Sequence, residues 1–300
     1  MSTDVNAASG GSPLVEVSNL NVFLPTGRRS EIEAVRNVSL VVNDGERVGI
    51  VGESGSGKSV TGRAIAGLLP TSPHVRVLGS IRVAGREMVG APAEEWQTIR
   101  SERVGMIFQD PLTFLNPVMR IGRQVAESIP RSRVGGDKRA QLAAVHEFLG
   151  KAGLEKVEQV ANSFPHELSG GMRQRVLIAI AIAKLPNLII ADEPTTALDA
   201  TVQQRVLRTL DETVTDLKTA MILISHDLAV VAGMTDRVYV MYAGKIVEEG
   251  PTERVLAHPT HPYTQALLRS VYSLTEADTE LYSIPPSLRR ELNAEVDGAA

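Results

Sequence analysis

The sequence predicts an α/β protein in which the core is preceded by a small β layer and interrupted by a mainly helical insert. Three observations predict this arrangement. The first part of the chain carries Val-rich runs separated by turn residues, which is typical of strands. The middle part carries helical periodicity instead. In the last part, short apolar runs typical of buried parallel strands alternate with helical segments.

The β layer and the start of the core are predicted within residues 14–93. Strands are predicted where Val and Leu are frequent, at 15–22, 34–42, 47–51 and, as shorter pieces, 75–89. The strand at 47–51 leads straight into a glycine-rich segment. A helix is predicted from 60 to 69, because Pro70 cannot continue it.

The middle of the chain, residues 94–164, is predicted to be a helical subdomain in which strand signals fade. Residues 139–152 carry apolar side chains at helical spacing, with Leu142 and Leu149 on the expected inner face. Residues 132–137 are predicted as a loop, since small and polar side chains dominate there.

The core is predicted to resume over residues 165–255. Runs at 189–192 and 221–225 have the composition of buried parallel strands, and 237–248 is predicted as a hairpin around a Gly-containing turn. The remaining segments are expected to be a disordered tail at 1–13 and a C-terminal helix and tail at 256–300.

The composition excludes several classes of protein. The 300 residues have a formal net charge of −4, which argues against nucleic acid as a partner, since nucleic-acid-binding proteins present a basic face. The absence of cysteine excludes disulfides, thiolate zinc sites and cysteine nucleophiles. The longest apolar run, 176–183, is far shorter than the roughly 20 residues of a membrane-spanning helix. With no secretory signal pattern at the N-terminus, we expect a cytosolic or peripheral membrane protein.

A phosphate-binding loop is predicted between the strand at 47–51 and the helix at 60–69. The segment 52–59 matches G-x-x-x-x-G-K-[ST], in which glycines let backbone N–H groups surround phosphates. Lys58 is expected to reach the β- and γ-phosphates of ATP, and Ser59 is expected to hold Mg²⁺. The residues predicted to bind ATP are Gly52, Glu53, Ser54, Gly55, Ser56, Gly57, Lys58, Ser59 and Val60.

Two adjacent carboxylates follow the apolar run at 188–191. Ligands collect at the carboxyl ends of strands in open α/β sheets, so this position suits catalysis. Asp192 is expected to complete the Mg²⁺ shell, and Glu193 is expected to activate the water that attacks the γ-phosphate. Taken alone, the same pattern also fits a strand that ends in a polar turn.

A second anion site is predicted at residues 169–171. Ser169 is a good N-cap, Gly170 and Gly171 allow close backbone approach, and the helix that follows is apolar on nearly every face. One nucleotide does not need two such sites in one subunit, unless the second serves a neighbour's nucleotide. An ordinary capped core helix is the alternative interpretation.

These motifs together resemble the ATP-binding-cassette (ABC) ATPases. The run 168–175 is similar to their signature sequence, Gln109 to the Q-loop glutamine, 197–199 to the D-loop, and His226 to the switch histidine. The resemblance extends from about residue 14 to about residue 270. It implies a P-loop NTPase core of the RecA-like type, with an antiparallel β subdomain and an α-helical subdomain.

The resemblance also implies how the sites work. Two subunits would pair head to tail, with each ATP held between one P-loop and the partner's Ser169, Gly170, Gly171 and Asp199. His226 would contact the γ-phosphate, and Gln109 would approach the Mg²⁺ as a ligand. The adenine would stack on an aromatic side chain of the first β layer, for which Phe23 is the best candidate, although a packed strand phenylalanine fits nearly as well.

The run 258–268, His-Pro-Thr-His-Pro-Tyr-Thr-Gln-Ala-Leu-Leu, resembles the ATP-binding subunits of oligopeptide and dipeptide importers. Its prolines favour the start of a helix over a metal site at His258 and His261. Many such subunits continue into a Cys-rich tail thought to hold an iron–sulfur cluster, which a chain without cysteine cannot hold. Expected partners are two membrane permeases, a second ABC ATPase subunit and an extracytoplasmic peptide-binding protein, at the cytoplasmic face of the membrane.

Other functions compete with this interpretation. An importer ATPase for nickel or another small solute shares much of the pattern. A soluble ABC ATPase acting on DNA or ribosomes usually carries long insertions, zinc cysteines or two cassettes, which this chain lacks. A P-loop kinase or GTPase would not explain 169–175, and the run 258–268 argues against an exporter subunit.

Overall fold

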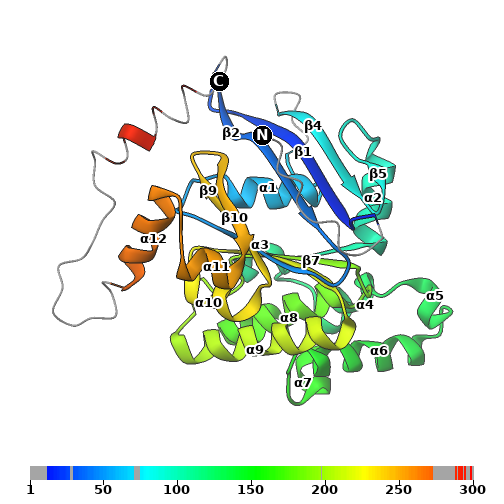
Figure 1. Cartoon of the computed structure of the whole chain (residues 1–300). Coiled ribbons are helices and arrows are strands. Elements are labelled where there is room, and N and C mark those ends of the chain that lie inside the picture. Colours follow the sequence, from blue (N-terminus) through cyan, green and yellow to red (C-terminus); the bar gives the residue numbers. More distant parts are fainter. Residues whose placement is uncertain are drawn as a thin grey trace.

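Two sheets and a group of helices form the molecule in Figure 1, a computed structural model. It describes residues 12–27, 30–70, 75–196 and 198–272, and the single positions 288, 290–292, 294 and 298. Most of the expected tails at 1–13 and 256–300 therefore lie outside the described residues. Within the described part, no helix is both long enough and apolar enough to cross a membrane.

The core sheet has six strands in the order β10-β9-β3-β8-β7-β6. Its strands are β3 (Arg47–Val51), β6 (Val104–Ile107), β7 (Leu188–Asp192), β8 (Ala220–Ser225), β9 (Arg237–Tyr242) and β10 (Lys245–Pro251). All neighbours pair in parallel except β9 and β10, which form the predicted hairpin. Because β3, β7 and β8 run in parallel, the segments after Val51, Asp192 and Ser225 all start at the carboxyl ends of the strands, on the same edge of the sheet.

Strand β6 is a correction to the prediction that strand signals fade between 94 and 164. It pairs with β7 and is the outermost strand on that side of the core sheet. The helix before it, α2 (Ala93–Glu102), packs Ile99 and Trp96 into the hydrophobic core beneath the front sheet. Four residues are too short to show a strand periodicity, so only pairing with a neighbour identifies β6. The span predicted as helical thus contains a strand of the core sheet.

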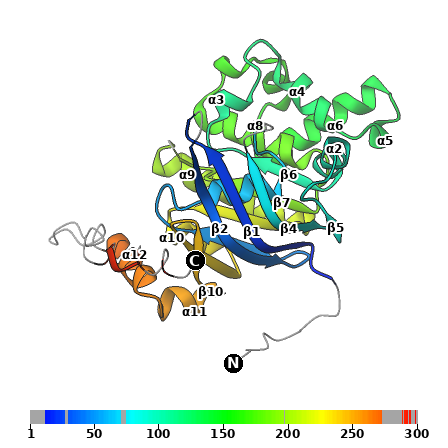
Figure 2. The same cartoon turned by 90° about the horizontal axis from the view of Figure 1, so that it is seen from above.

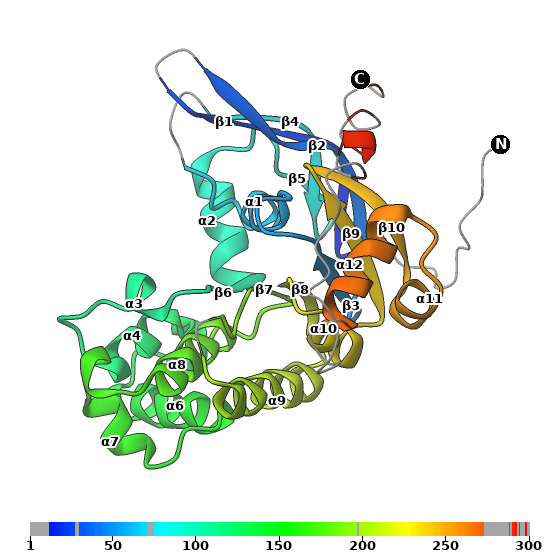
Figure 3. The same cartoon turned by 90° about the vertical axis from the view of Figure 1, so that its left-hand side faces the viewer.

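The front sheet is antiparallel, in the order β2-β1-β4-β5. It comprises β1 (Val15–Pro25), β2 (Glu31–Val42), β4 (Arg76–Val83) and β5 (Arg86–Glu87). Its inner face is apolar and packs over α1 (Lys58–Ile65), which lies between the two sheets in Figure 3. This helix was predicted at 60–69. It begins two residues earlier, at Lys58, and ends at Ile65.

The helical part lies on one side of the core sheet. It comprises α3 (Pro111–Phe114), α4 (Ile121–Ser128), α5 (Arg131–Val134), α6 (Lys138–Lys151), α7 (Val157–Asn162), the 3₁₀ turn Pro165–Glu167 and α8 (Gly170–Ile182). Helix α8 packs against α3, α4 and α6. Two predictions are wrong here. Helix α5 occupies part of the loop predicted at 132–137, and Leu142 is 53% exposed. The buried face of α6 instead contains Val145, Phe148 and Leu149, which pack toward the centre of this part.

The remaining helices follow strands of the core sheet: α9 (Ala200–Leu217), α10 (Leu228–Met234), α11 (Thr252–Ala257) and α12 (Pro262–Tyr272). Figure 2 shows α11 and α12 on the opposite side of the molecule from the helical part. Leu292, from the C-terminal segment, is 3% exposed and belongs to the same hydrophobic core as α8.

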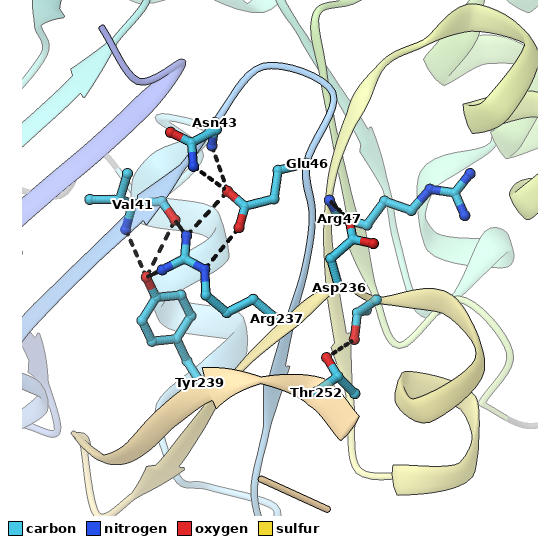
Figure 4. A network of polar contacts seen from close by, with 9 residues as sticks. Val41, Asn43, Glu46, Arg47, Asp236, Arg237, Tyr239 and Thr252 are labelled. Atoms are coloured by element: carbon cyan, nitrogen blue, oxygen red, sulfur yellow. Dashed lines mark hydrogen bonds and ion pairs between the residues drawn. The ribbon is translucent and has the colours of Figure 1, made fainter. Parts of the chain in front are cut away.

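A polar network joins the strands at the edge where β3 begins (Figure 4). Arg237 on β9 donates to the Glu46 carboxylate, to the carbonyl of Val41 and to the hydroxyl of Tyr239. Burial alone would raise the pKa of Glu46, but hydrogen bonds from Arg237 and Asn43 hold it below its usual value. The network ties the β2–β3 turn to β9 at the edge opposite the P-loop.

Candidate active site

The P-loop leaves the carboxyl end of β3 through two glycines that no other residue could replace. Gly52 has φ 152°, and a Cβ there would lie 2.1 Å from the carbonyl oxygen of Met241. Gly57 has φ 100°, and its Cβ would lie 2.6 Å from the carbonyl oxygen of Ala34. The tight turn leads into α1, whose N-terminal N–H groups face the loop.

Lys58 is buried at the centre of this loop, with 3% of its surface exposed. Its Nζ donates to the carbonyl oxygens of Gly52 and Glu53, each at 2.8 Å. Burial lowers the pKa of Lys58, and the carboxylates of Glu193 and Asp192 oppose that change. The lysine therefore lies where the loop and the two carboxylates converge, and its contact with phosphates stays a prediction.

Ser59 and Asp192, the two residues predicted to hold Mg²⁺ with Gln109, contact each other directly. The Ser59 hydroxyl donates to Oδ1 of Asp192 at 2.6 Å, and Arg63 lies 3.6 Å from Oδ2. Asp192 is 1% exposed, and burial raises its pKa against the opposing effects of Ser59 and Arg63. A hydroxyl and a carboxylate are the oxygen ligands that Mg²⁺ prefers. These residues therefore fit Mg²⁺.

The P-loop also contains a buried hydroxyl that fits an anion. Ser56 is 4% exposed, and among the described residues its Oγ has no hydrogen-bond partner. A buried polar atom without a partner is costly, unless a bound group satisfies it. With the N–H groups of the loop and Lys58, this hydroxyl suits a polyphosphate.

Glu193 joins residues from distant parts of the chain. Its carboxylate accepts hydrogen bonds from Gln109 Nε2 at 3.2 Å and from Thr196 Oγ1 at 2.9 Å, and His226 Nδ1 lies 3.4 Å away. The structure thus brings Gln109, Glu193 and His226 together. Gln109, also predicted as a metal ligand, contacts Glu193 here. The role of Glu193 as a general base stays a prediction.

The starts of helices α8 and α9 lie side by side. Ser169 caps α8, accepting from the N–H of Met172 at 3.3 Å, and Asp199 caps α9, accepting from Val202 at 3.0 Å. A Cβ at Gly171 would come within 2.3 Å of Val202, so the glycine allows the two helices to approach. Ser169 and Gly170 are exposed. The D-loop residue Ala197 lies outside the described residues.

Phe23 lies in β1 beneath the guanidinium of Arg76, whose Cζ is 4.2 Å from the ring centre. The next residue, Leu24, packs against the hydrophobic core of the front sheet. Phe23 is partly buried, and its stacking on adenine stays a prediction.

Three residues that support the site were not predicted. Buried Gln174 donates to the carbonyl oxygen of Phe108 and thereby holds the segment before Gln109. Tyr263 accepts a hydrogen bond from the N–H of Glu53. Thr196 contacts Glu193. Gln174 and Tyr263 fall inside runs that the sequence analysis singles out, but both have mainly polar sequence neighbours, and nothing local indicates that they are buried.

Comparison with known protein families agrees with this geometry. Residues 35–196 match the family model described as ABC transporter, and residues 247–298 match the one described as oligopeptide/dipeptide transporter, C-terminal region. The chain is 45% identical over 273 residues to the oligopeptide transport ATP-binding protein OppD of Bacillus subtilis, covering 91% of this chain and 76% of that protein. It is 43% identical over 272 residues to the dipeptide transport ATP-binding protein DppD of Lactococcus lactis subsp. cremoris, covering 91% and 77%.

Solved structures show the same fold. The dimeric post-hydrolysis state of the ATP-binding cassette MJ0796, bound to ADP and Pi, has a TM-score of 0.70 and 29% identity, covering 79% of this chain and 98% of that one. The structure of cbiO1 from Clostridium perfringens has a TM-score of 0.68 and 24% identity, covering 83% and 92%. The predicted fold class, an α/β cassette with an antiparallel β subdomain and a helical subdomain, is confirmed.

Proposed function

The chain belongs to the ABC transporter family, and we propose that it is the ATP-hydrolysing subunit of an importer for oligopeptides or dipeptides. One observation carries this proposal: the P-loop, the Asp192–Glu193 pair, Gln109 and His226 converge at one edge of the core sheet. The match of residues 247–298 to the oligopeptide/dipeptide C-terminal region supports peptides as the cargo, rather than nickel or another small solute.

ATP binding follows from the P-loop. Backbone N–H groups of the loop and of the start of α1 hold the phosphates, and Lys58 contacts the β- and γ-phosphates. Lys58 can leave the carbonyls of Gly52 and Glu53 for phosphate oxygens because a lysine stem is flexible and its charge attracts the anion. Ser59 and Asp192 would hold Mg²⁺, which neutralises phosphate charge when bound.

Hydrolysis uses Glu193 as the general base. Its carboxylate takes a proton from a water molecule, whose oxygen attacks the γ-phosphorus in line with the leaving group. The bond between the γ-phosphorus and the bridging oxygen breaks, and ADP and phosphate leave. The contacts from Gln109 and Thr196 orient the Glu193 carboxylate, and His226 is placed to contact the γ-phosphate.

A complete site requires a second subunit. Ser169, Gly170 and Asp199 are exposed at two adjoining helix N-termini, with the buried Gly171 allowing the two helices to approach. Such N-termini attract anions. In a head-to-tail pair, they would contact the γ-phosphate bound to the partner's P-loop. The dimeric form of the similar cassette MJ0796 supports this arrangement.

An exposed apolar surface follows Gln109 and suits a membrane permease. Leu112 is 61% exposed, Phe114 45% and Val118 82%, all within or next to α3. Single exposed apolar side chains are common, but a cluster beside a functional residue indicates an interface. Two permeases docked there would place this chain at the cytoplasmic face of the membrane, and an extracytoplasmic binding protein would select the peptide.

The test is a native pull-down of this chain from detergent-solubilised membranes, with every co-purifying protein identified. The expected result is two permease chains with a second ATPase subunit, and the associated binding protein would then identify the cargo. Recovery with ribosomes or DNA-processing proteins from the soluble fraction would contradict the transporter assignment. A Leu112→Asp variant should lose the permeases and retain ATP binding.

A further inference from the structure

Tyr263, in the first turn of α12, contacts the P-loop from the far end of the chain. The backbone N–H of Glu53 donates to the Tyr263 hydroxyl at 2.8 Å, between residues 210 positions apart. The Tyr263 side chain is fully buried, and its ring lies 4.6 Å from that of Tyr242 on β9. The contact joins the C-terminal region to the start of the phosphate-binding loop.

The contact falls on the peptide group that links Gly52 to Glu53. The carbonyl oxygen of this group accepts a hydrogen bond from Lys58, and its N–H donates to Tyr263. A peptide group is planar, so a partner that holds its N–H also sets the direction of its carbonyl. Glycine restrains its own backbone less than any other residue. Tyr263 therefore restrains the peptide group against which Lys58 rests.

The position of Tyr263 is itself determined by a charged group on β10. The Glu248 carboxylate is 7% exposed and accepts hydrogen bonds from the N–H of Thr260 at 2.9 Å and from the N–H of His261 at 3.0 Å. Burial would raise the pKa of Glu248, but these hydrogen bonds hold it below its usual value, so the group is charged at neutral pH. His261 Nδ1 in turn accepts from the N–H of Tyr263.

We propose that Tyr263 is a positioning residue for the P-loop, and that through it the C-terminal helix raises the affinity of this site for ATP. The hydroxyl pre-organises the Gly52–Glu53 peptide, so the loop loses less conformational freedom when phosphate binds. The inference rests on the proposed function of the chain as an ATPase.

The test compares Tyr263→Phe with wild type in the full-length chain, by equilibrium binding of ATP and by steady-state hydrolysis. Loss of one hydrogen bond should raise the ATP Kd and KM about three- to tenfold, with kcat changed less than about twofold, because Glu193 is untouched. The matched control is Tyr239→Phe (Figure 4). Tyr239 is also buried, and its hydroxyl also accepts a backbone N–H, from Val41 at 3.0 Å, but at the opposite edge of the sheet.

Both variants should unfold at lower denaturant concentration than wild type, but only Tyr263→Phe should bind ATP more weakly. Equal ATP affinity in Tyr263→Phe and wild type overturns the inference, and so does equal weakening in both variants. If the wild-type chain itself binds no ATP, the proposed function fails instead.

A double-mutant cycle of Glu248→Gln with Tyr263→Phe adds a second variant to the test. Glu248→Gln should weaken ATP binding in the wild-type background and have no further effect in the Tyr263→Phe background, because Glu248 is proposed to act on the P-loop only through the tyrosine hydroxyl. Additive losses would show that Glu248 acts elsewhere and would contradict the proposed route. If Tyr263→Phe does not fold, unchanged ATP binding in Glu248→Gln alone overturns the inference.

Discussion

At the P-loop, the side chains of Lys58, Ser59 and Glu193 have partners within this chain, whereas the functional side chains at the start of α8 face solvent. The buried Ser56 hydroxyl is the exception, because among the described residues it has no partner. Lys58 donates to two carbonyl oxygens of the P-loop itself, while Ser59 and Glu193 make hydrogen bonds to groups from distant parts of the chain. Ser169 and Asp199 accept hydrogen bonds from the first turns of their own helices and are exposed.

The difference follows from burial. A buried charge or hydroxyl needs an internal partner, because it has lost water. An exposed helix N-terminus keeps its hydrogen bonds with water until another molecule replaces them. We therefore expect the P-loop region to bind nucleotide within one chain. We propose that the exposed starts of α8 and α9 contact a nucleotide held by another subunit. Four experiments test this distinction, in order of decreasing effect.

Glu193→Gln should bind ATP normally and hydrolyse it about 10²- to 10⁴-fold more slowly, because a general base contributes that much. The amide keeps the shape and the hydrogen bonds of the side chain while losing its basicity. The measurement is single-turnover hydrolysis, with ATP binding as the internal control. A turnover equal to that of wild type would reject Glu193 as the base.

Lys58→Ala should weaken ATP binding by about 10- to 100-fold, since a hydrogen bond to a charged phosphate contributes roughly 1.5–3 kcal/mol. The matched control is Lys138→Ala, which removes an exposed lysine in the first turn of α6. Titration with a fluorescent ATP analogue measures both. An unchanged Kd for Lys58→Ala would contradict the predicted role of the P-loop.

Ser169→Arg should leave ATP binding to its own P-loop intact and slow hydrolysis about tenfold at the partner's site, because the new side chain blocks the helix N-terminus. The measurement uses mixed dimers that carry the variant in one subunit together with Glu193→Gln in one or the other subunit. Ser132→Arg, exposed on α5, is the control. If the slow site is the variant's own, the head-to-tail arrangement is wrong.

Lys184 follows the C-terminal end of α8, the end away from the exposed Ser169, and its pKa offers a test of how burial affects stability at that end. Burial lowers the pKa of Lys184 to about 8 from its ordinary 10.5, and its Nζ donates to the carbonyl oxygen of Arg100. Between these values the unfolded chain binds more protons than the folded chain, so the free energy of unfolding should rise with pH. Relative to Lys184→Met, the rise should be about 1 kcal/mol from about pH 8 to about pH 9. Denaturant unfolding at several pH values measures it, and parallel pH profiles for the two proteins would contradict it.

Much of the fold was predictable because its signals are local. The glycines of the P-loop, the hairpin and the N-cap at Ser169 each depend on a few neighbouring residues, and all were found at their predicted positions. Strand β6 was not predicted, because four residues at the end of a sheet have no periodicity of their own. Leu142 was assigned to the wrong face of α6, because periodicity does not say where neighbouring helices lie.

The sequence by itself determined which residues are predicted to carry the chemistry: the P-loop, two carboxylates after an apolar strand and a capped helix with paired glycines. Only the tertiary structure decided which of them meet. Gln109 reaches Glu193 across 84 positions because it follows β6, the parallel neighbour of β7. Tyr263 reaches Glu53 across 210 positions because α12 packs Tyr263 against Tyr242 of β9, the neighbour of β3. Local conformation depends on residues a few positions apart, whereas such contacts depend on how the whole apolar core packs.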